Sequence, residues 1–205
     1  MHPEYDGWEN DIALIHLDEA PVGVTPYPLY AGSDESGQLI SIVGRGVTAT
    51  GLEGERNGVS DGQLRRATNV IASVDSQWLG IFFEAPGEEN ITALKGVGAA
   101  GDSGCPVFLE TDDGLVIVGI NSWGEGEGSI RVGQYGAWDY QTRISQFSSW
   151  IDDGIANAGS VPVTEPEEKS EAGCSNFGSF AWPNCWGFLA VFTVLRRRSR
   201  QSSFC

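Results

Sequence analysis

A serine set between two glycines is the segment best suited to chemistry, since residues 101–104 are Gly-Asp-Ser-Gly. Acyl transfer by a serine needs a hydroxyl, a base that takes its proton, a carboxylate that orients the base, and donors for the developing oxyanion. The flanking glycines allow a tight turn that exposes the Ser103 hydroxyl and directs the N–H groups of Gly101 and Ser103 at one point. The segment predicts a nucleophile and an oxyanion hole, although so short a string also occurs by chance in a glycine-rich chain.

A carboxylate at the start of a predicted strand is the second candidate. Asn10-Asp11 leads into Ile12–Leu17, an apolar segment rich in β-forming residues. Taken alone, Asp11 could equally be a capping group. The chain has two histidines, His2 and His16. Because side chains alternate along a strand, His16 is expected on the face opposite to Asp11, and neither histidine is expected to be the base.

These segments follow one another in an order that resembles the chymotrypsin-like (trypsin-fold, S1) serine proteases, from about residue 2 to residue 155. Asn10-Asp11-Ile12-Ala13-Leu14 is similar to the family's strand that bears the catalytic aspartate, which implies that Asp11 orients the base. Ser122-Trp123-Gly124 is similar to the family's substrate-binding edge strand, whose serine also hydrogen-bonds that aspartate. The turn at residues 44–46 and the helix that ends at residues 147–151 match in the same register.

The resemblance implies an all-β fold, a chymotrypsin-like double β-barrel with the second barrel complete, the first partial, and a C-terminal helix. It implies a serine endopeptidase that acts on protein or peptide substrates and needs no metal or organic cofactor. Asp102, next to the nucleophile, is then a structural switch that pairs with a new N-terminal ammonium. The alternative is a non-catalytic protease homologue, used as a peptide-binding or surface adhesion module.

The chain departs from the family pattern at the base. His2 opens His-Pro-Glu-Tyr, which resembles a non-catalytic segment of the family, and no Thr-Ala-Ala-His-Cys-like segment precedes Asp11. The chain could be an N-terminally truncated form of an intact protease or an inactive remnant. Truncation is favoured because missing barrel strands would leave open sheet edges. Without its base, the chain as given is predicted to be inactive.

Val97 suggests a substrate preference through the same resemblance. In the family, the residue six before the nucleophile floors the pocket for the side chain that precedes the scissile bond. An apolar Val97 there, where relatives that cut after Arg or Lys carry Asp, implies a non-basic preference. The pocket wall is expected to include Gly124 and a later glycine, Gly133 or Gly136.

Charge and cysteine content limit the partners. The formal net charge is −16, and because four arginines and no carboxylates follow residue 173, the first 173 residues carry −20. Such an acidic body repels nucleic acid, so none is expected as a partner. Cys105 is the lone cysteine of this body, where a buried free thiol is the expected state.

The sequence divides into three parts: a protease domain at 1–157, an acidic, proline-containing linker at 158–173, and a tail at 174–205. One convincing helix is expected, at 145–155. The expected strands are 12–17, 39–43, 64–73, 78–83, 107–109 and 115–120.

The tail combines a cysteine, an apolar stretch and an arginine cluster, Arg196-Arg197-Arg198-Ser199-Arg200. This order resembles the C-terminal sorting signals of some secreted bacterial proteins, with Cys174 as the processing or anchoring site. A weak single-pass membrane anchor is the alternative, with the arginines on the cytoplasmic side. Either interpretation predicts a bacterial protein that is secreted or tethered at the cell surface.

Overall fold

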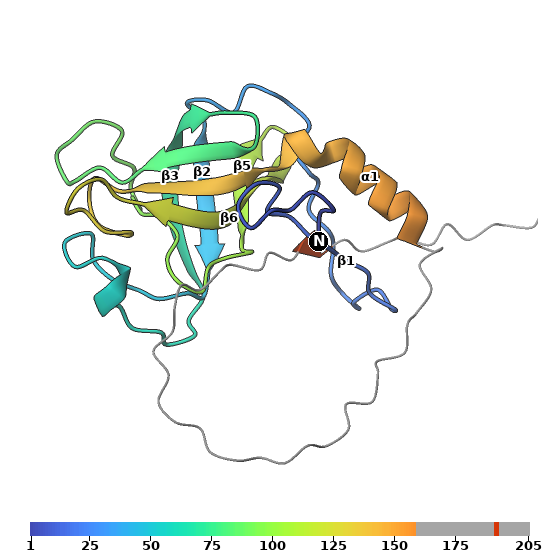
Figure 1. The fold of residues 1–205 in the computed structure, drawn as a ribbon, viewed down its shortest axis with the longest axis horizontal. Coiled ribbons are helices and arrows are strands. Elements are labelled where there is room, and N and C mark those ends of the chain that lie inside the picture. The colour runs from blue at the N-terminus through green and yellow to red at the C-terminus, as the bar shows by residue number, and fades with distance from the viewer. Residues whose placement is uncertain (159–190, 193–205) are drawn as a thin grey trace, which may run out of the picture.

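Six antiparallel strands close into a barrel in the order β2-β3-β4-β7-β6-β5 (Figure 1). The computed structural model describes residues 1–158 and 191–192. The barrel strands are β2 (Leu39–Gly44), β3 (Arg65–Val74), β4 (Trp78–Phe82), β5 (Pro106–Thr111), β6 (Gly114–Glu125) and β7 (Trp138–Arg143). This barrel and the helix that follows it confirm the expected all-β, trypsin-like fold.

Alternating side chains fill the barrel. In β2, Ile40 and Ile42 point inward and are almost fully buried, while Leu39 is exposed. Inward-facing residues of the other strands complete one apolar cluster with them: Ile71, Leu79, Ile81, Val107, Leu109 and Val118. Because the barrel is closed, every strand is paired with a neighbour on both sides over most of the barrel's length.

The strand β7 was not expected from the sequence. Four of its residues are buried although they are polar or charged: Asp139, Gln141, Thr142 and Arg143. A strand that carries polar side chains inside the protein lacks the hydrophobic alternation by which strands are recognised. The predicted strand at 12–17 is much shorter, because only β1 (Leu14–Ile15) forms there.

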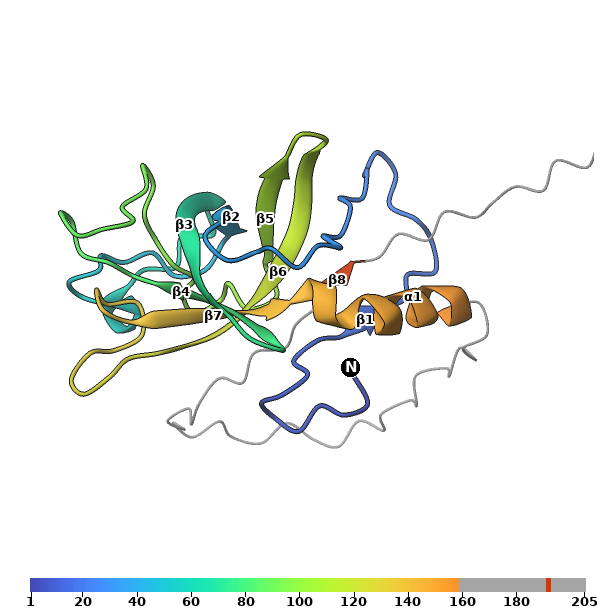
Figure 2. The ribbon, with the colours of Figure 1, turned by 90° about the horizontal axis from the view of Figure 1, so that it is seen from above.

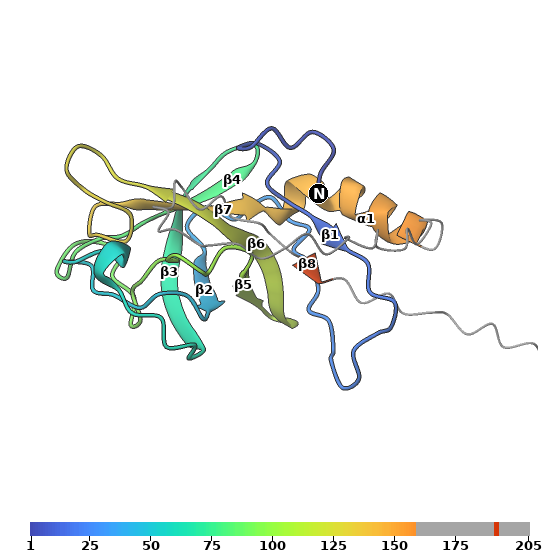
Figure 3. The same cartoon turned by 60° about the horizontal axis from the view of Figure 1, so that its bottom comes forward.

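The N-terminal segment lies outside the barrel. β1 pairs in parallel with β8 (Val191–Phe192), and Leu29 makes an isolated bridge to Ile117 of β6. Within residues 1–158 and 191–192, the structure shows one closed barrel and, apart from it, the two-stranded pairing of β1 with β8. β1 lies beside the C-terminal helix in two views (Figure 2, Figure 3).

A second apolar cluster joins this segment to the end of the chain's folded body. The short 3-10 turn η2 (Ile144–Phe147) leads directly from β7 into α1 (Ser148–Asn157). Ile144, Phe147 and Ile151 pack with Ile12 and Ile120. The helix therefore fixes the strand-like segment around Ile12 against one end of the barrel. A further 3-10 turn, η1 (Glu55–Asn57), lies among the loops at the opposite end (Figure 1).

The predicted linker and tail lie outside the described residues, except for Ala158 and the two residues of β8. The boundaries at 157 and 173 and the sorting or anchor function of the tail therefore stay predictions. Among the residues that can be placed, no helix is long and apolar enough to cross a membrane.

Candidate active site

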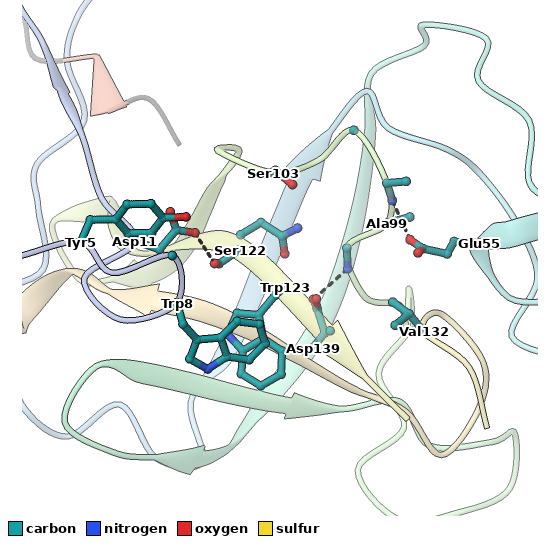
Figure 4. Close-up of a pocket in the computed structure, with 16 residues that line it drawn as sticks. Tyr5, Trp8, Asp11, Glu55, Ala99, Ser103, Ser122, Trp123, Val132 and Asp139 are labelled. Atoms are coloured by element: carbon teal, nitrogen blue, oxygen red, sulfur yellow. Dashed lines mark hydrogen bonds between the residues drawn. The ribbon is translucent and has the colours of Figure 1, made fainter. Parts of the chain in front are cut away.

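A hollow of about 500 Å³ opens between the loop at 98–103, the end of β6 and the N-terminal segment (Figure 4). The predicted site residues that line it are Asp11, Gly101, Ser103, Ser122, Trp123 and Gly124. They come from three segments that are far apart in the sequence. The structure thus brings together every predicted site residue except Val97.

The nucleophile loop has the geometry that its glycines allow. Gly101 has φ +94°, a region that side-chain-bearing residues rarely adopt, and a Cβ there would lie 3.2 Å from Cα of Gly46. The N–H of Gly104 donates to the carbonyl of Asn121 at 2.9 Å, which holds the loop on β6. Within the described residues, the N–H groups of Gly101 and Ser103 have no hydrogen-bond acceptor. Both are therefore available to an oxyanion.

Asp102 points to the other side of this loop. Its Oδ1 accepts a hydrogen bond from the N–H of Gly46 at 2.6 Å, and its Oδ2 accepts one from Ala99 at 3.1 Å. The carboxylate lines a second recess and is not among the residues around the hollow. It holds the nucleophile loop against the turn that follows β2, and the switch role stays a prediction.

Asp11 is held at the edge of the hollow by contacts on both sides. The Ser122 hydroxyl donates to Asp11 Oδ2 at 2.6 Å (Figure 4). The Thr142 hydroxyl donates to the Asp11 carbonyl at 2.8 Å. The next residue, Ile12, is buried in the cluster under α1. Burial raises the pKa of Asp11, and the Ser122 hydrogen bond opposes that rise. The carboxylate is oriented as an acceptor for a further donor.

Neither histidine lines the hollow. The ring of His2 packs against Phe147 and Trp150, with centroid distances of 5.6 and 4.9 Å. Its Nδ1 accepts a hydrogen bond from the N–H of Glu4 at 3.2 Å. His16 is exposed beyond β1. Among the residues described, no imidazole is placed to take a proton from Ser103.

After residue 121, the main chain of β6 is paired with another strand on one side and unpaired on the other. Pairing of β6 with β5 ends at Ile120, opposite Pro106, whereas pairing with β7 continues to Glu125, opposite Trp138. A register shift between Asn121 and Trp123 sets Ser122 out of the regular ladder. Residues 122–124 of this unpaired stretch line the hollow, so an extended peptide could pair there.

Aromatic rings form the wall below this edge. Trp123 lies 4.3 Å from Trp8 and 4.1 Å from Tyr140, measured between ring centroids, and its ring is stacked on that of Tyr140. Trp8 remains 49% exposed and lines the hollow (Figure 4). Nothing in the sequence around Trp8 indicates a site residue, because its position depends on how the N-terminal segment folds back over β6.

Val97 is the one predicted site residue that does not line the hollow. It packs against the barrel core and lines the second recess, where Gly133 also lies. Of the expected glycine walls, Gly124 lines the hollow, whereas Gly133 and Gly136 are not among its lining residues. The base of the hollow is formed instead by polar side chains that the sequence had not suggested, among them Asp139 and Asn121.

Cys105 is a half-buried free thiol. Burial raises its pKa, and the nearby Asp102 carboxylate raises it further. A thiol held in its neutral form is a poor nucleophile, in keeping with the expected structural role. Among the described residues, no group of three or more His, Cys, Asp or Glu side chains could hold a metal ion.

Comparison of the sequence and structure with known proteins identifies the family of the chain. The family model described as Trypsin matches residues 1–151. Vitamin K-dependent protein C of Rattus norvegicus is 26% identical over 164 residues, which cover 74% of this chain and 34% of that protein. This chain thus spans about a third of that relative's length. A solved structure of a mutant of human heparin binding protein has 22% sequence identity and a TM-score of 0.46, over 67% of this chain and 52% of that one. The family match over residues 1–151 shows that the chain belongs to the trypsin family of serine proteases.

Proposed function

We propose that this chain carries the nucleophile, the orienting carboxylate and the oxyanion hole of a serine endopeptidase. The observation that supports this most directly is that Ser103, the Asp11–Ser122 pair and the free N–H groups of Gly101 and Ser103 all face one hollow. Ser103 Oγ would attack the scissile carbonyl carbon while a histidine oriented by Asp11 takes its proton. The two N–H groups stabilise the oxyanion, and the C–N bond breaks as the histidine returns the proton to the leaving amine. Water then hydrolyses the acyl-enzyme by the same route.

The histidine in this mechanism has to be supplied by residues other than the 205 of this chain, because His2 and His16 are placed elsewhere. The chain on its own is therefore proposed to lack peptidase turnover. A serine hydroxyl without a base is a weak nucleophile, although the oxyanion hole and the substrate edge are retained.

The second candidate is a non-catalytic homologue that binds extended peptides. Its specific support is that the open edge at residues 122–125 is formed while no imidazole lines the hollow among the described residues. Main-chain pairing at this edge would give affinity, and the hollow would select a side chain.

A fluorophosphonate probe separates the two candidates. The longest natural form of the protein that contains this chain should be labelled, and Ser103→Ala should abolish the labelling. The Ser145→Ala variant is a matched control, because Ser145 lies in η2 and hydrogen-bonds Glu35. Unlabelled Ser103 in that form, together with retained peptide binding, would favour the non-catalytic candidate. Peptidase turnover by the 205-residue chain itself would contradict the proposed inactivity.

The remaining proposals concern the location of the protein. We place the protease domain at 1–157, a linker at 158–173, and a bacterial sorting or anchor tail at 174–205, which would put the domain outside the cytoplasmic membrane. Fusion of residues 158–205 to a reporter domain tests this. The reporter should reach the cell surface in a Cys174-dependent manner if the tail is a sorting signal.

A further inference from the structure

A carboxylate is buried at the base of the hollow. Asp139, on β7, is 4% exposed and is one of the lining residues (Figure 4). Its Oδ2 accepts two hydrogen bonds, from the N–H of Gly98 at 2.9 Å and from Nε2 of Gln141 at 3.0 Å. None of the ion pairs formed among the described residues includes it. Buried carboxylates are normally paired with a cation, so this one is incompletely compensated.

A second polar side chain beside Asp139 has an oxygen without a hydrogen-bond donor. Asn121 is 4% exposed and lines the hollow, and its Oδ1 has no hydrogen-bond partner within the described residues. The Asn121 amide lies against Gly98, the residue whose N–H donates to Asp139. A carboxylate and an unpaired amide oxygen thus flank the same glycine. Both are acceptors, and a donor-rich group would satisfy both.

The surrounding charges also favour a cation. Burial raises the pKa of Asp139 to about 7; the Gly98 hydrogen bond opposes this shift, while the negative charges of Asp102 and Glu55 add to it. Glu55 itself lines the hollow. A cation that entered would compensate the Asp139 charge and experience the attraction of all three acids.

The part of the hollow next to Asp139 has room for the aliphatic part of a long side chain. A Cβ on Gly124 would lie 2.9 Å from Cγ1 of Val132 and 3.7 Å from Oδ1 of Asp139, so the lack of a side chain there keeps this oxygen reachable. Val132, Ala99 and the Trp123 ring line the hollow between Asp139 and the open edge. Apolar walls that lead to a buried acceptor pair suit a long side chain with a charged end.

We propose that Asp139 and Asn121 bind the cationic end of a substrate Lys or Arg side chain, the one that precedes the bond attacked by Ser103. The position of that side chain rests on the proposed function, whereas binding of the cation does not. This assignment replaces the non-basic preference expected from Val97, whose side chain packs against the barrel core instead of lining the hollow. The recognising carboxylate comes from β7 and not from the nucleophile loop.

The test uses benzamidine, a flat cation, and benzamide, a neutral molecule of nearly the same shape, titrated into the 205-residue chain at pH 8 by calorimetry. Benzamidine should bind at least about tenfold more tightly than benzamide, because an amidinium can bond the carboxylate through two N–H groups. Asp139→Asn should remove this difference. Asp113→Asn, in the turn between β5 and β6, is a matched control that removes one negative charge far from the hollow and should keep it.

Three results would overturn the proposal: equal binding of benzamidine by the chain and by Asp139→Asn, preference of the chain for benzamide, or binding of neither probe. The comparison of the two probes on the unchanged chain remains decisive if Asp139→Asn does not fold. Fluorophosphonate labelling of the longest natural form that contains this chain, measured separately, reports on Ser103. Cation binding without labelling would contradict the catalytic proposal alone, and labelling without cation preference would contradict this inference alone.

Discussion

At the scale of single residues, the site depends on a few hydrogen bonds between segments distant in sequence. Ser122 and Asp11 are 111 positions apart, yet their side chains lie 2.6 Å from each other. Asp139 and Gly98 are 41 positions apart, and Oδ2 of Asp139 accepts a hydrogen bond from the main-chain N–H of Gly98 at 2.9 Å. In both cases a carboxylate is removed from water and supplied with a donor by another element. Their ionisation therefore reports directly on the geometry of the hollow.

The Ser122 hydroxyl should tune the ionisation of Asp11. Ser122→Ala removes the donor that opposes the effect of burial, so the pKa of Asp11 should rise further. Because a half-buried carboxylate loses a hydrogen bond, the free energy of unfolding should fall by about 1 kcal/mol. Carboxyl-carbon NMR titration measures the pKa. Ser148→Ala, which removes a hydroxyl bonded to the carbonyl of Ser145, should leave it unchanged.

Asp139 should make the protein less stable as pH rises from about 4 to 7. Its pKa is about 7 in the folded protein and about 4 in the unfolded chain, so over this range only the unfolded state releases the proton. The stability of the protein relative to Asp139→Asn should therefore fall across this window and level off above pH 7. Urea unfolding at several pH values measures it. Parallel stability curves for the two proteins would contradict the buried, uncompensated state of this carboxylate.

At the scale of elements, the site lies where regular pairing stops. β5 leaves β6 at Ile120, the register of β6 against β7 shifts after Asn121, and the nucleophile loop returns to β6 through Gly104. Each interruption frees backbone groups while the adjoining strands keep them in place. The barrel thus supplies a rigid frame around a short stretch of unpaired N–H and C=O groups, as binding and catalysis require.

Gly101→Ala should damage the oxyanion hole more than a comparable substitution elsewhere. The alanine would adopt φ +94° and bring its Cβ to 3.2 Å from Gly46, so the loop must move. Unfolding free energy should fall by about 1 kcal/mol or more, and fluorophosphonate labelling of the longest natural form that contains this chain should be lost. Gly114→Ala is the matched control, since it has φ +113° with open space around it. It should cost similar backbone strain without affecting labelling.

At the scale of the whole molecule, buried polar contacts join the segments outside the barrel to its strands. Glu35, which lies before β2, accepts two hydrogen bonds from the Arg143 guanidinium at the end of β7, at 2.8 and 2.9 Å. Ser145 donates a third at 2.8 Å. Burial would raise the pKa of Glu35, but these bonds bring it below its ordinary value. The N-terminal segment is thereby fixed to the strand that also carries Asp139.

Removing the Glu35 charge should destabilise the protein strongly. Glu35→Gln leaves the Arg143 guanidinium buried without its counterion, which typically costs about 3–5 kcal/mol. Asp61→Asn, in a solvent-exposed pair with Arg65, should change stability far less than Glu35→Gln does. Because the folded pKa of Glu35 is lowered, the contribution of this pair is present above its unfolded pKa and is lost as the pH falls through the folded value. Chemical denaturation of both variants at neutral and acidic pH checks this expectation.

The sequence by itself determined the features that rest on neighbouring residues. Short apolar segments rich in β-forming residues predicted most barrel strands, and the glycines around Ser103 predicted a tight turn, since both signals depend on local backbone preferences. The pairing of Asp11 with Ser122 followed from resemblance, and the structure reproduces the contact.

Only the tertiary structure decided which side chains form the hollow. Asp139 lies on a strand without hydrophobic alternation, and Val97 packs into the core one residue before a glycine that lines the hollow. The register of β6 against β7 sets Asp139 opposite Gly124, and packing against the barrel core sets the position of Val97. Neither is encoded in the spacing of nearby residues.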